Sequence, residues 1–242
     1  MRETMRNFLL LISRAGLALL VPIATMAATL AAPPNRLEVV YDVLRNGMVL
    51  GEVTERLEHG DGKYQLVETT KGRGFLAALG SIKRSSRGTV AATGLRPLEF
   101  VDERTGRETA RASFDWDART LTMQFRGSPE VHPLPPNPQD RLSFLLSLAF
   151  VPPGAQPVNM SVADGGSVSQ YVFAVVGRER MKVPAGEFET IKIARVKDGP
   201  EDRRTTEIWL APAQGNILVR MLVTDHKDGT QIDQVATKIS GQ

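Results

Sequence analysis

The sequence predicts an all-β, mainly antiparallel protein of roughly twelve strands, arranged as a sandwich, roll or barrel. From Leu37 onward, apolar and polar residues alternate in short runs, and LEVVYDV places Leu37, Val39 and Tyr41 on one face. Turn residues interrupt these runs at short intervals, beginning with Asn46-Gly47, which favours a tight hairpin. The pattern therefore favours strands joined by turns over alternating strands and helices.

The same alternation continues along most of the chain. Turns are expected at Asp61-Gly62, Asp164-Gly165 and Asp228-Gly229, where the residue types tolerate positive φ. The predicted strands cover residues 37–43, 48–59, 63–70, 107–116, 119–125, 158–162, 167–176, 189–196, 205–211, 217–225 and 230–239. The Pro-rich stretch 128–138 is short for a domain linker, so we expect one β domain over residues 36–242.

One segment, near residues 140–150, reads as a helix. Leu142, Leu145 and Ala149 share one helical face in DRLSFLLSLAF. Asp140 is placed to accept the first N–H groups of this helix, and Ser143 falls in its first turn. A catalytic serine needs a base and an oxyanion site, and no motif of that kind surrounds Ser143, so a structural role is favoured over a hydrolase.

The N-terminal residues predict export. Residues 1–31 combine arginines, an uncharged apolar run and a small-residue end, as in a secretory signal peptide. The alternative is an N-terminal membrane anchor, because the apolar run approaches the ~20 residues that span a bilayer. The expected location is the periplasm, and no later segment is long and apolar enough to span a membrane.

Composition excludes several function classes. Removing residues 1–31 takes away three Arg and one Glu, which leaves 27 basic and 26 acidic residues and a charge of +1. Such a balanced chain has no electrostatic signature of nucleic-acid binding. The absence of Cys excludes disulfides and thiol catalysis, and three scattered His predict no metal site and no cofactor.

Several short motifs, in order, resemble the exported bacterial family known as domain of unknown function 3108. They are Tyr41-x-Val with Gly47 and Gly51, Gly94-Leu95-x-Pro97, Gln139-Asp140-x-x-Ser143, Val183-Pro184-Ala185-Gly186-x-Phe188, Trp209-Leu210-Ala211-Pro212 and Val219-Arg220. Ile217-Leu218 departs from the Leu-Pro pair that we associate with the family. The resemblance implies an envelope-located open barrel or spiral β-roll, marks Asp140, Ser143, Pro184, Gly186, Trp209 and Arg220 as structural motif residues, and supplies no catalytic residue.

Three functional hypotheses remain. The leading one is a non-enzymatic binding or scaffold module of the envelope with a lipid or other apolar ligand, for which Tyr41, Phe75, Trp116 and Trp209 are candidate contacts. GFLAALG, residues 74–80, is either a flap over an apolar cavity or a loop tucked into the core, and the basic run 83–87 either meets anionic lipid or is solvated. The alternatives are an assembly factor whose exposed strand edge pairs with an envelope protein, and a hydrolase using Ser143. Oligomeric state is not predicted.

Overall fold

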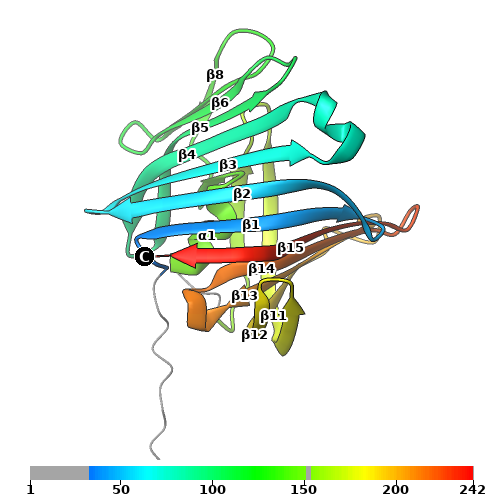
Figure 1. The fold of residues 1–242 in the computed structure, drawn as a ribbon. Helices are drawn as coiled ribbons and strands as arrows, with labels where there is room; N and C mark the ends of the chain where they lie inside the picture. Colours follow the sequence, from blue (N-terminus) through cyan, green and yellow to red (C-terminus); the bar gives the residue numbers. More distant parts are fainter. Residues whose placement is uncertain (1–32, 151–153, 242) are drawn as a thin grey trace, which may run out of the picture.

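The computed structural model describes residues 33–150 and 154–241, so the predicted signal peptide or anchor lies outside the described residues. Fifteen strands form one continuous sheet (Figure 1). They are β1 (Arg36–Arg45), β2 (Met48–Gly60), β3 (Lys63–Gly72), β4 (Ser81–Ala91), β5 (Gly94–Arg104), β6 (Ala110–Asp115), β7 (Thr120–Gln124), β8 (Glu130–Pro133), β9 (Pro138–Asp140), β10 (Val158–Ala163), β11 (Val168–Val183), β12 (Gly186–Arg195), β13 (Arg204–Ala211), β14 (Ile217–Asp225) and β15 (Thr230–Gly241).

The first and last strands of the chain pair with each other, and this pairing joins the two halves of the chain in one sheet. The order is β8-β7-β6-β5-β4-β3-β2-β1-β15-β14-β13-β12-β11-β10-β9, so the first strand pairs with the last. Every neighbouring pair is antiparallel except β9 and β10. The end strands β8 and β9 do not pair with each other, and the prediction of an all-β open barrel or roll is confirmed.

Local sequence explains most of the turns. Asn46 and Gly47 have φ of 48° and 82°, the positive values that a two-residue hairpin turn between β1 and β2 requires. Asp61 and Gly62 repeat this arrangement between β2 and β3. The strand count is fifteen rather than about twelve, partly because two short strands, β8 and β9, lie in or beside the Pro-rich stretch, where prolines hide the alternation.

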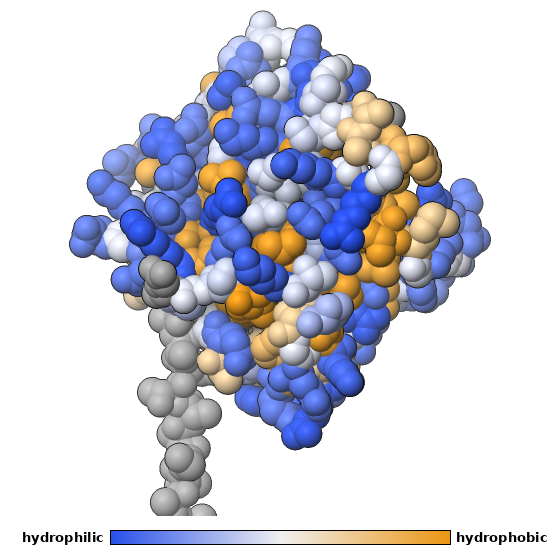
Figure 2. Space-filling view, in the orientation of Figure 1, coloured by the Kyte–Doolittle hydropathy of each residue, from blue (hydrophilic) through white to orange (hydrophobic). Residues whose placement is uncertain are grey.

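The concave face of the sheet carries the core. On β1, Leu37, Val39 and Tyr41 are buried, as the alternation predicts, and they belong to one cluster that draws on both halves of the sheet. Most of the surface in Figure 2 is hydrophilic, but hydrophobic residues gather at the upper right, over the end of the β1–β2 hairpin and the short 3-10 helix η1 (Gly74–Leu79). No helix within the described ranges is long and apolar enough to cross a membrane.

Helix α1 (Ser143–Phe150) packs inside the roll against β5, β9 and β14. Asp140 Oδ1 accepts the N–H groups of Leu142 and Ser143 at 2.8 Å each. Gln139 Nε2 donates to Leu95 O on β5 at 2.8 Å, and Ser86 Oγ donates to Asp140 Oδ2 at 2.5 Å. These bonds tie one end of the sheet to β4 and β5 across the interior.

The β11–β12 hairpin forms a second closure. Pro184 and Ala185 make its two-residue turn, Gly186 has φ of 145°, and the Ala185 N–H donates to Ala236 O on β15 at 3.0 Å. Trp209 is buried near this hairpin, with the Arg220 guanidinium 5.0 Å from its ring centre. Arg220 makes two 2.9 Å bonds to Asp233, so Trp209, Arg220 and Asp233 form one cluster of contacts.

Candidate functional site

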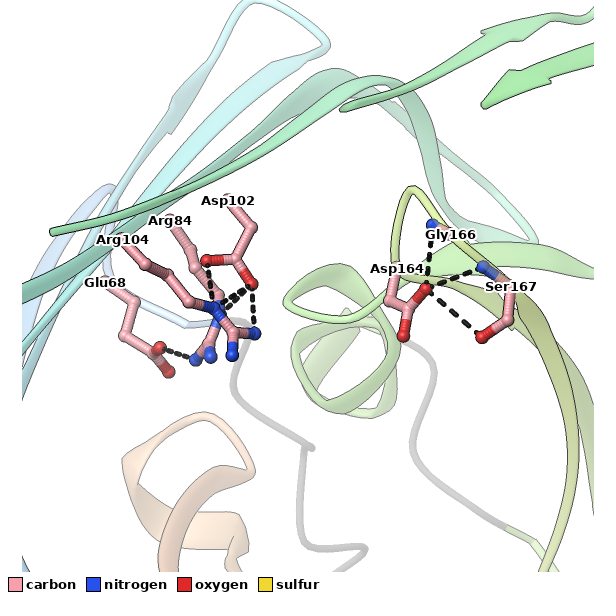
Figure 3. Close-up of polar contacts among 7 residues, drawn as sticks. All are labelled: Glu68, Arg84, Asp102, Arg104, Asp164, Gly166 and Ser167. Carbon is pink, nitrogen blue, oxygen red and sulfur yellow. Dashed lines mark hydrogen bonds and ion pairs between the residues drawn. The ribbon is translucent and has the colours of Figure 1, made fainter. Parts of the chain in front are cut away.

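Four charged residues form a row across neighbouring strands on the concave face. Glu55 on β2, Glu68 on β3, Arg84 on β4 and Asp102 on β5 are paired directly opposite one another. Arg84 Nη1 contacts Glu68 Oε1 at 2.5 Å, and Arg84 Nε donates to Asp102 Oδ2 at 3.0 Å. Arg104, two residues along β5, donates to the same carboxylate at 2.6–3.1 Å (Figure 3).

The charge states of this row depend on burial and on the partners. Burial alone would raise the pKa of Asp102, but hydrogen bonds from Arg104 and Arg84 outweigh it and lower the pKa below its usual value. Glu55 has no such cation, and burial together with the nearby Glu68 charge raises its pKa to about 8. Tyr41 OH lies 3.4 Å from Glu55 Oε2 and donates to Leu218 O at 3.1 Å. At neutral pH, Glu55 is therefore mainly protonated.

On one side of this row, nearer the ends of the strands beside η1, lies a cavity of about 340 Å³, which Leu76 of η1 helps to line and which we call the η1 cavity. Leu76 of η1 lies against Gly72, where a Cβ would come within 2.5 Å of the Leu76 backbone carbonyl, so only glycine permits this close return of the chain. The lining is apolar at Val43, Leu50, Leu76 and Ile82, and it includes Lys71, Arg104 and Arg107 but no Asp or Glu. The lining of the cavity therefore combines apolar and basic side chains.

Arg104 and Arg107 also line a neighbouring cavity of about 360 Å³. Its far side is the β10–β11 turn, where Asp164 Oδ1 accepts the N–H groups of Gly166 at 3.0 Å and Ser167 at 2.8 Å. Figure 3 shows this turn facing the Arg84–Arg104 cluster across the interior. The two arginines thus stand where the two cavities meet.

A third cavity, of about 250 Å³, lies on the other side of the charged row. Glu55, Glu68 and Arg84 form its polar wall, while Phe144 and Leu145 of α1 contribute apolar wall. We call it the helix cavity. The helix therefore covers both packed core and a small void.

Two larger hollows lie elsewhere. The first, about 700 Å³, is lined mainly by polar and charged residues such as Glu58, Lys63 and Arg87. The second, about 620 Å³, contains Trp116 and ends at Gly154, beside residues 151–153, which are outside the described part of the chain. The second hollow also combines apolar side chains with an arginine, Arg96, whereas the lining of the η1 cavity contains three basic residues.

The four aromatic candidates do not share one cavity in the described structure. Tyr41 and Trp209 are buried, and Trp209 Nε1 donates to Glu179 Oε1. The Arg96 guanidinium lies over the Trp116 ring, 4.2 Å from the centre of the ring. Phe75 is 85% exposed on η1, directly beside the cavity-lining Leu76.

Asp140 and Ser143 form a buried polar network rather than an exposed serine site. Ser143 Oγ accepts the Asp140 N–H at 2.8 Å, and the Tyr64 hydroxyl lies 2.9 Å from Ser86 Oγ. Burial raises the pKa of Asp140 to about 6, against the opposing effect of its hydrogen bonds from Ser86, Ser143 and Leu142. His132, on β8, lies opposite Leu121 and makes no hydrogen bond to Ser143 within the described residues.

Apart from Arg84, which lies in the basic run 83–87, the polar residues that define the cavities are not candidates from sequence. Arg84 is 12% exposed and pairs with Glu68 and Asp102, so for this residue both interpretations of the run, contact with anionic lipid and solvation, are wrong. In the sequence, the charged residues of the row are surrounded by other charged residues of the kind that usually face solvent. Only the strand pairing shows that Glu55, Arg84, Asp102 and Arg104 meet on the concave face. One usable signal existed: GFLAALG is a short apolar segment within a basic neighbourhood, and this segment is η1.

The comparisons with known proteins identify a family. The profile described as "Protein of unknown function (DUF3108)" matches residues 37–234, so the chain belongs to this family and the resemblance is confirmed. A search of curated proteins finds no match.

Two solved structures are similar to the chain. One is a candidate lipoprotein of Parabacteroides distasonis, with 9% identity, a TM-score of 0.38, and coverage of 86% of this chain and 97% of that chain. The other is a candidate exported protein with a YmcC-like fold from Bacteroides fragilis, with 13% identity, a TM-score of 0.39 and the same coverages.

Proposed function

We propose that the protein is an exported, periplasmic binding module of the cell envelope that takes an anionic amphiphile, such as a lipid fragment, into the η1 cavity. The observation that carries this proposal is the lining of that cavity, which combines four aliphatic with three basic side chains and, among the described residues, contains no Asp or Glu. Its volume of about 340 Å³ falls within the range of roughly 300–1,000 Å³ that small-molecule sites occupy.

The two ends of such a ligand have different partners. The apolar chain would lie against Leu50, Leu76 and Ile82, and its burial supplies most of the affinity. The anionic group would meet Arg107, which forms no ion pair within the described residues, and the guanidinium of Arg104. Hydrogen bonds between a guanidinium and a carboxylate or phosphate are the stronger, charge-assisted kind.

Export is supported by the predicted signal peptide. A binding role is supported over hydrolysis because the Ser143 hydroxyl is buried and hydrogen-bonded to the Asp140 backbone. The charged row holds Arg104 in place through Asp102, which gives the site a rigid cation.

The test is isothermal titration of the purified protein with decanoate and with decyl glucoside, which carries a similar chain on a neutral head. Ile82→Trp fills the cavity and is expected to weaken both ligands by about tenfold or more, since a buried chain is worth ~0.8 kcal/mol per CH₂. Arg107→Gln is expected to weaken decanoate by at least about threefold and to leave decyl glucoside unchanged.

Matched controls are Val176→Trp, at a 62% exposed position of β11, and Arg111→Gln, on an exposed position of β6. Both should bind as the parent does. Equal affinities across all four variants would place any binding outside the η1 cavity and refute the proposal.

A further inference from the structure

The edge formed by η1 and the start of β2 exposes large apolar side chains. Phe75 is 85% exposed, Met48 66% and Val49 38%, and we call these three residues the apolar rim. Figure 2 shows hydrophobic residues gathered over these elements at the upper right. We infer that the apolar rim docks on the surface of an anionic lipid bilayer.

The rim is held in place by backbone bonds. The Arg73 N–H donates to Leu50 O at 2.9 Å, which joins η1 to β2. Asn46 bonds twice to Gln231, through its N–H at 3.0 Å and through its side-chain oxygen at 2.8 Å, which fixes the β1–β2 turn to β15. Phe75 therefore projects outward on a supported segment, while the next residue, Leu76, faces the cavity.

The charges around the rim complement an anionic surface. Arg45, Lys71 and Lys227 are exposed and form no ion pair within the described ranges. The nearby carboxylates of Asp42 and Glu52 both contact Arg73, at 3.0 and 2.9 Å. Asp228, in the β14–β15 turn, is a further acid, so the four cations Arg45, Lys71, Arg73 and Lys227 exceed the three acids Asp42, Glu52 and Asp228 by one charge.

This combination matches a lipid surface better than a protein one. Aromatic and aliphatic side chains insert at the headgroup boundary while neighbouring Lys and Arg remain at anionic headgroups. A stable protein interface needs roughly 800 Å² per partner, and three side chains do not provide that area. A second copy of the chain would also bring Arg45, Lys71 and Lys227 toward their own counterparts.

Docking would place the η1 cavity at the bilayer, since Phe75 and Leu76 are adjacent. This extends the proposed function, but the docking itself rests on the rim and its charges. The two are separable because Ile82→Trp fills the cavity without changing a rim residue.

The experiment is co-sedimentation of the purified protein with phosphatidylcholine vesicles, with and without phosphatidylglycerol. We expect binding to the anionic vesicles only, weakened by added salt because exposed charges are screened. Phe75→Ser should reduce the partition coefficient about tenfold, and Met48→Ser by a smaller factor, since each removes buried apolar area.

The control is Val131→Ser, at a 65% exposed position of β8. Both this variant and Ile82→Trp should bind the vesicles as the parent does. Absence of vesicle binding, equal binding to neutral vesicles, or an equal loss in Val131→Ser would overturn the inference. Sedimentation velocity of the protein alone provides the other decisive outcome: a dimer that Phe75→Ser abolishes would assign the rim to a second copy of the chain.

Discussion

Glu55 shows how the interior changes the chemistry of one residue. Its carboxyl group faces the helix cavity, and neither Arg84 nor Arg104 bonds to it. Burial and Glu68 therefore raise its pKa to about 8 from an ordinary value near 4.5. Between these values the folded protein holds a proton that the unfolded chain releases, so stability from this group falls as pH rises.

The first prediction concerns Glu55→Gln. We expect the variant to be close to the parent in stability at pH 5 and more stable than the parent at pH 9, because the amide carries no charge at either pH. Each unit of pKa shift corresponds to about 1.4 kcal/mol, so at pH 9 the free energy of unfolding of the variant should exceed that of the parent by more than about 2 kcal/mol. Urea unfolding at both pH values measures it, with Glu58→Gln, exposed on the same strand, as the control. A gain that is equal at the two pH values would contradict the assignment.

Arg84 is the cation on which the buried carboxylates depend. Its guanidinium is 12% exposed and contacts Glu68 and Asp102, which are 11% and 4% exposed. Arg104 supports Asp102 from the other side, but no other ion pair to Glu68 occurs within the described residues.

The second prediction is that Arg84→Ala destabilises the protein by about 3–5 kcal/mol, because it leaves buried charge without a partner. Arg87→Ala provides the comparison on the same strand: its pair with Glu99 is exposed, and such pairs contribute about 0–1 kcal/mol. Urea unfolding of both variants at neutral pH measures the difference. Similar losses for the two arginines would show that the row is not a buried network.

At the scale of the element, α1 depends on polar groups that precede it. The helix has eight residues, too short to be stable alone, and Asp140 bonds its first turn while accepting from Ser86 on β4. The same side chain therefore caps the helix and fixes it to the sheet.

The third prediction compares two aspartates with the same local pattern. Asp115 also accepts two following N–H groups, at 3.1 and 2.7 Å, but in an exposed turn. Asp140→Ala is expected to cost at least about 2 kcal/mol, because buried donors lose their acceptor, while Asp115→Ala should cost about 0.5–1 kcal/mol. Thermal unfolding followed by circular dichroism distinguishes them, and equal losses would remove the special role of burial at Asp140.

The local sequence pattern predicts strands, turns and the helix better than it predicts the residues that line the cavities. Alternation and turn residues predict the β1–β2 hairpin, and helical periodicity with Asp140 as a cap predicts the segment of α1, because both depend on a few adjacent side chains. The charged row was not predictable, because Glu55, Arg84 and Asp102 meet only through the register of four strands. Tyr41, Trp116 and Trp209 are candidates by residue type and Phe75 by its place in GFLAALG, and the packing of the roll distributes the four among different environments.

At the scale of the whole molecule, the sheet limits which partners can join it. Its two terminal strands, β8 and β9, have four and three residues and contain Pro133 and Pro138, whereas β11 extends past β10 and, within the described residues, has no strand partner on that side over residues 174–183. Short edges with proline resist the addition of another strand. The two terminal strands therefore give little support to an assembly factor that pairs through them, and the open edge of β11 is the longer place for a partner strand to add.

The pairing of β1 with β15 makes the two halves of the chain one sheet. Asp140, which follows the Pro-rich stretch, also bonds to Ser86, which precedes it. These contacts connect the parts of the chain before and after the Pro-rich stretch 128–138, which in the sequence could be a domain linker. We therefore expect residues 36–242 to unfold as one cooperative unit, a single domain.

The last prediction uses the two tryptophans of the chain, one in each half. Trp116 follows β6 and donates to Pro97 O at 2.7 Å, whereas Trp209 is buried on β13. In Trp209→Phe, fluorescence reports the N-terminal half, and in Trp116→Phe it reports the C-terminal half. Because the halves share the β1–β15 pairing and the closure at Asp140, the fluorescence midpoint in urea should equal the circular-dichroism midpoint within each variant. Comparison within each variant removes the stability change that the substitution itself causes. Separate midpoints for fluorescence and circular dichroism in either protein would show that the halves unfold independently, and would make the Pro-rich stretch a linker between two units.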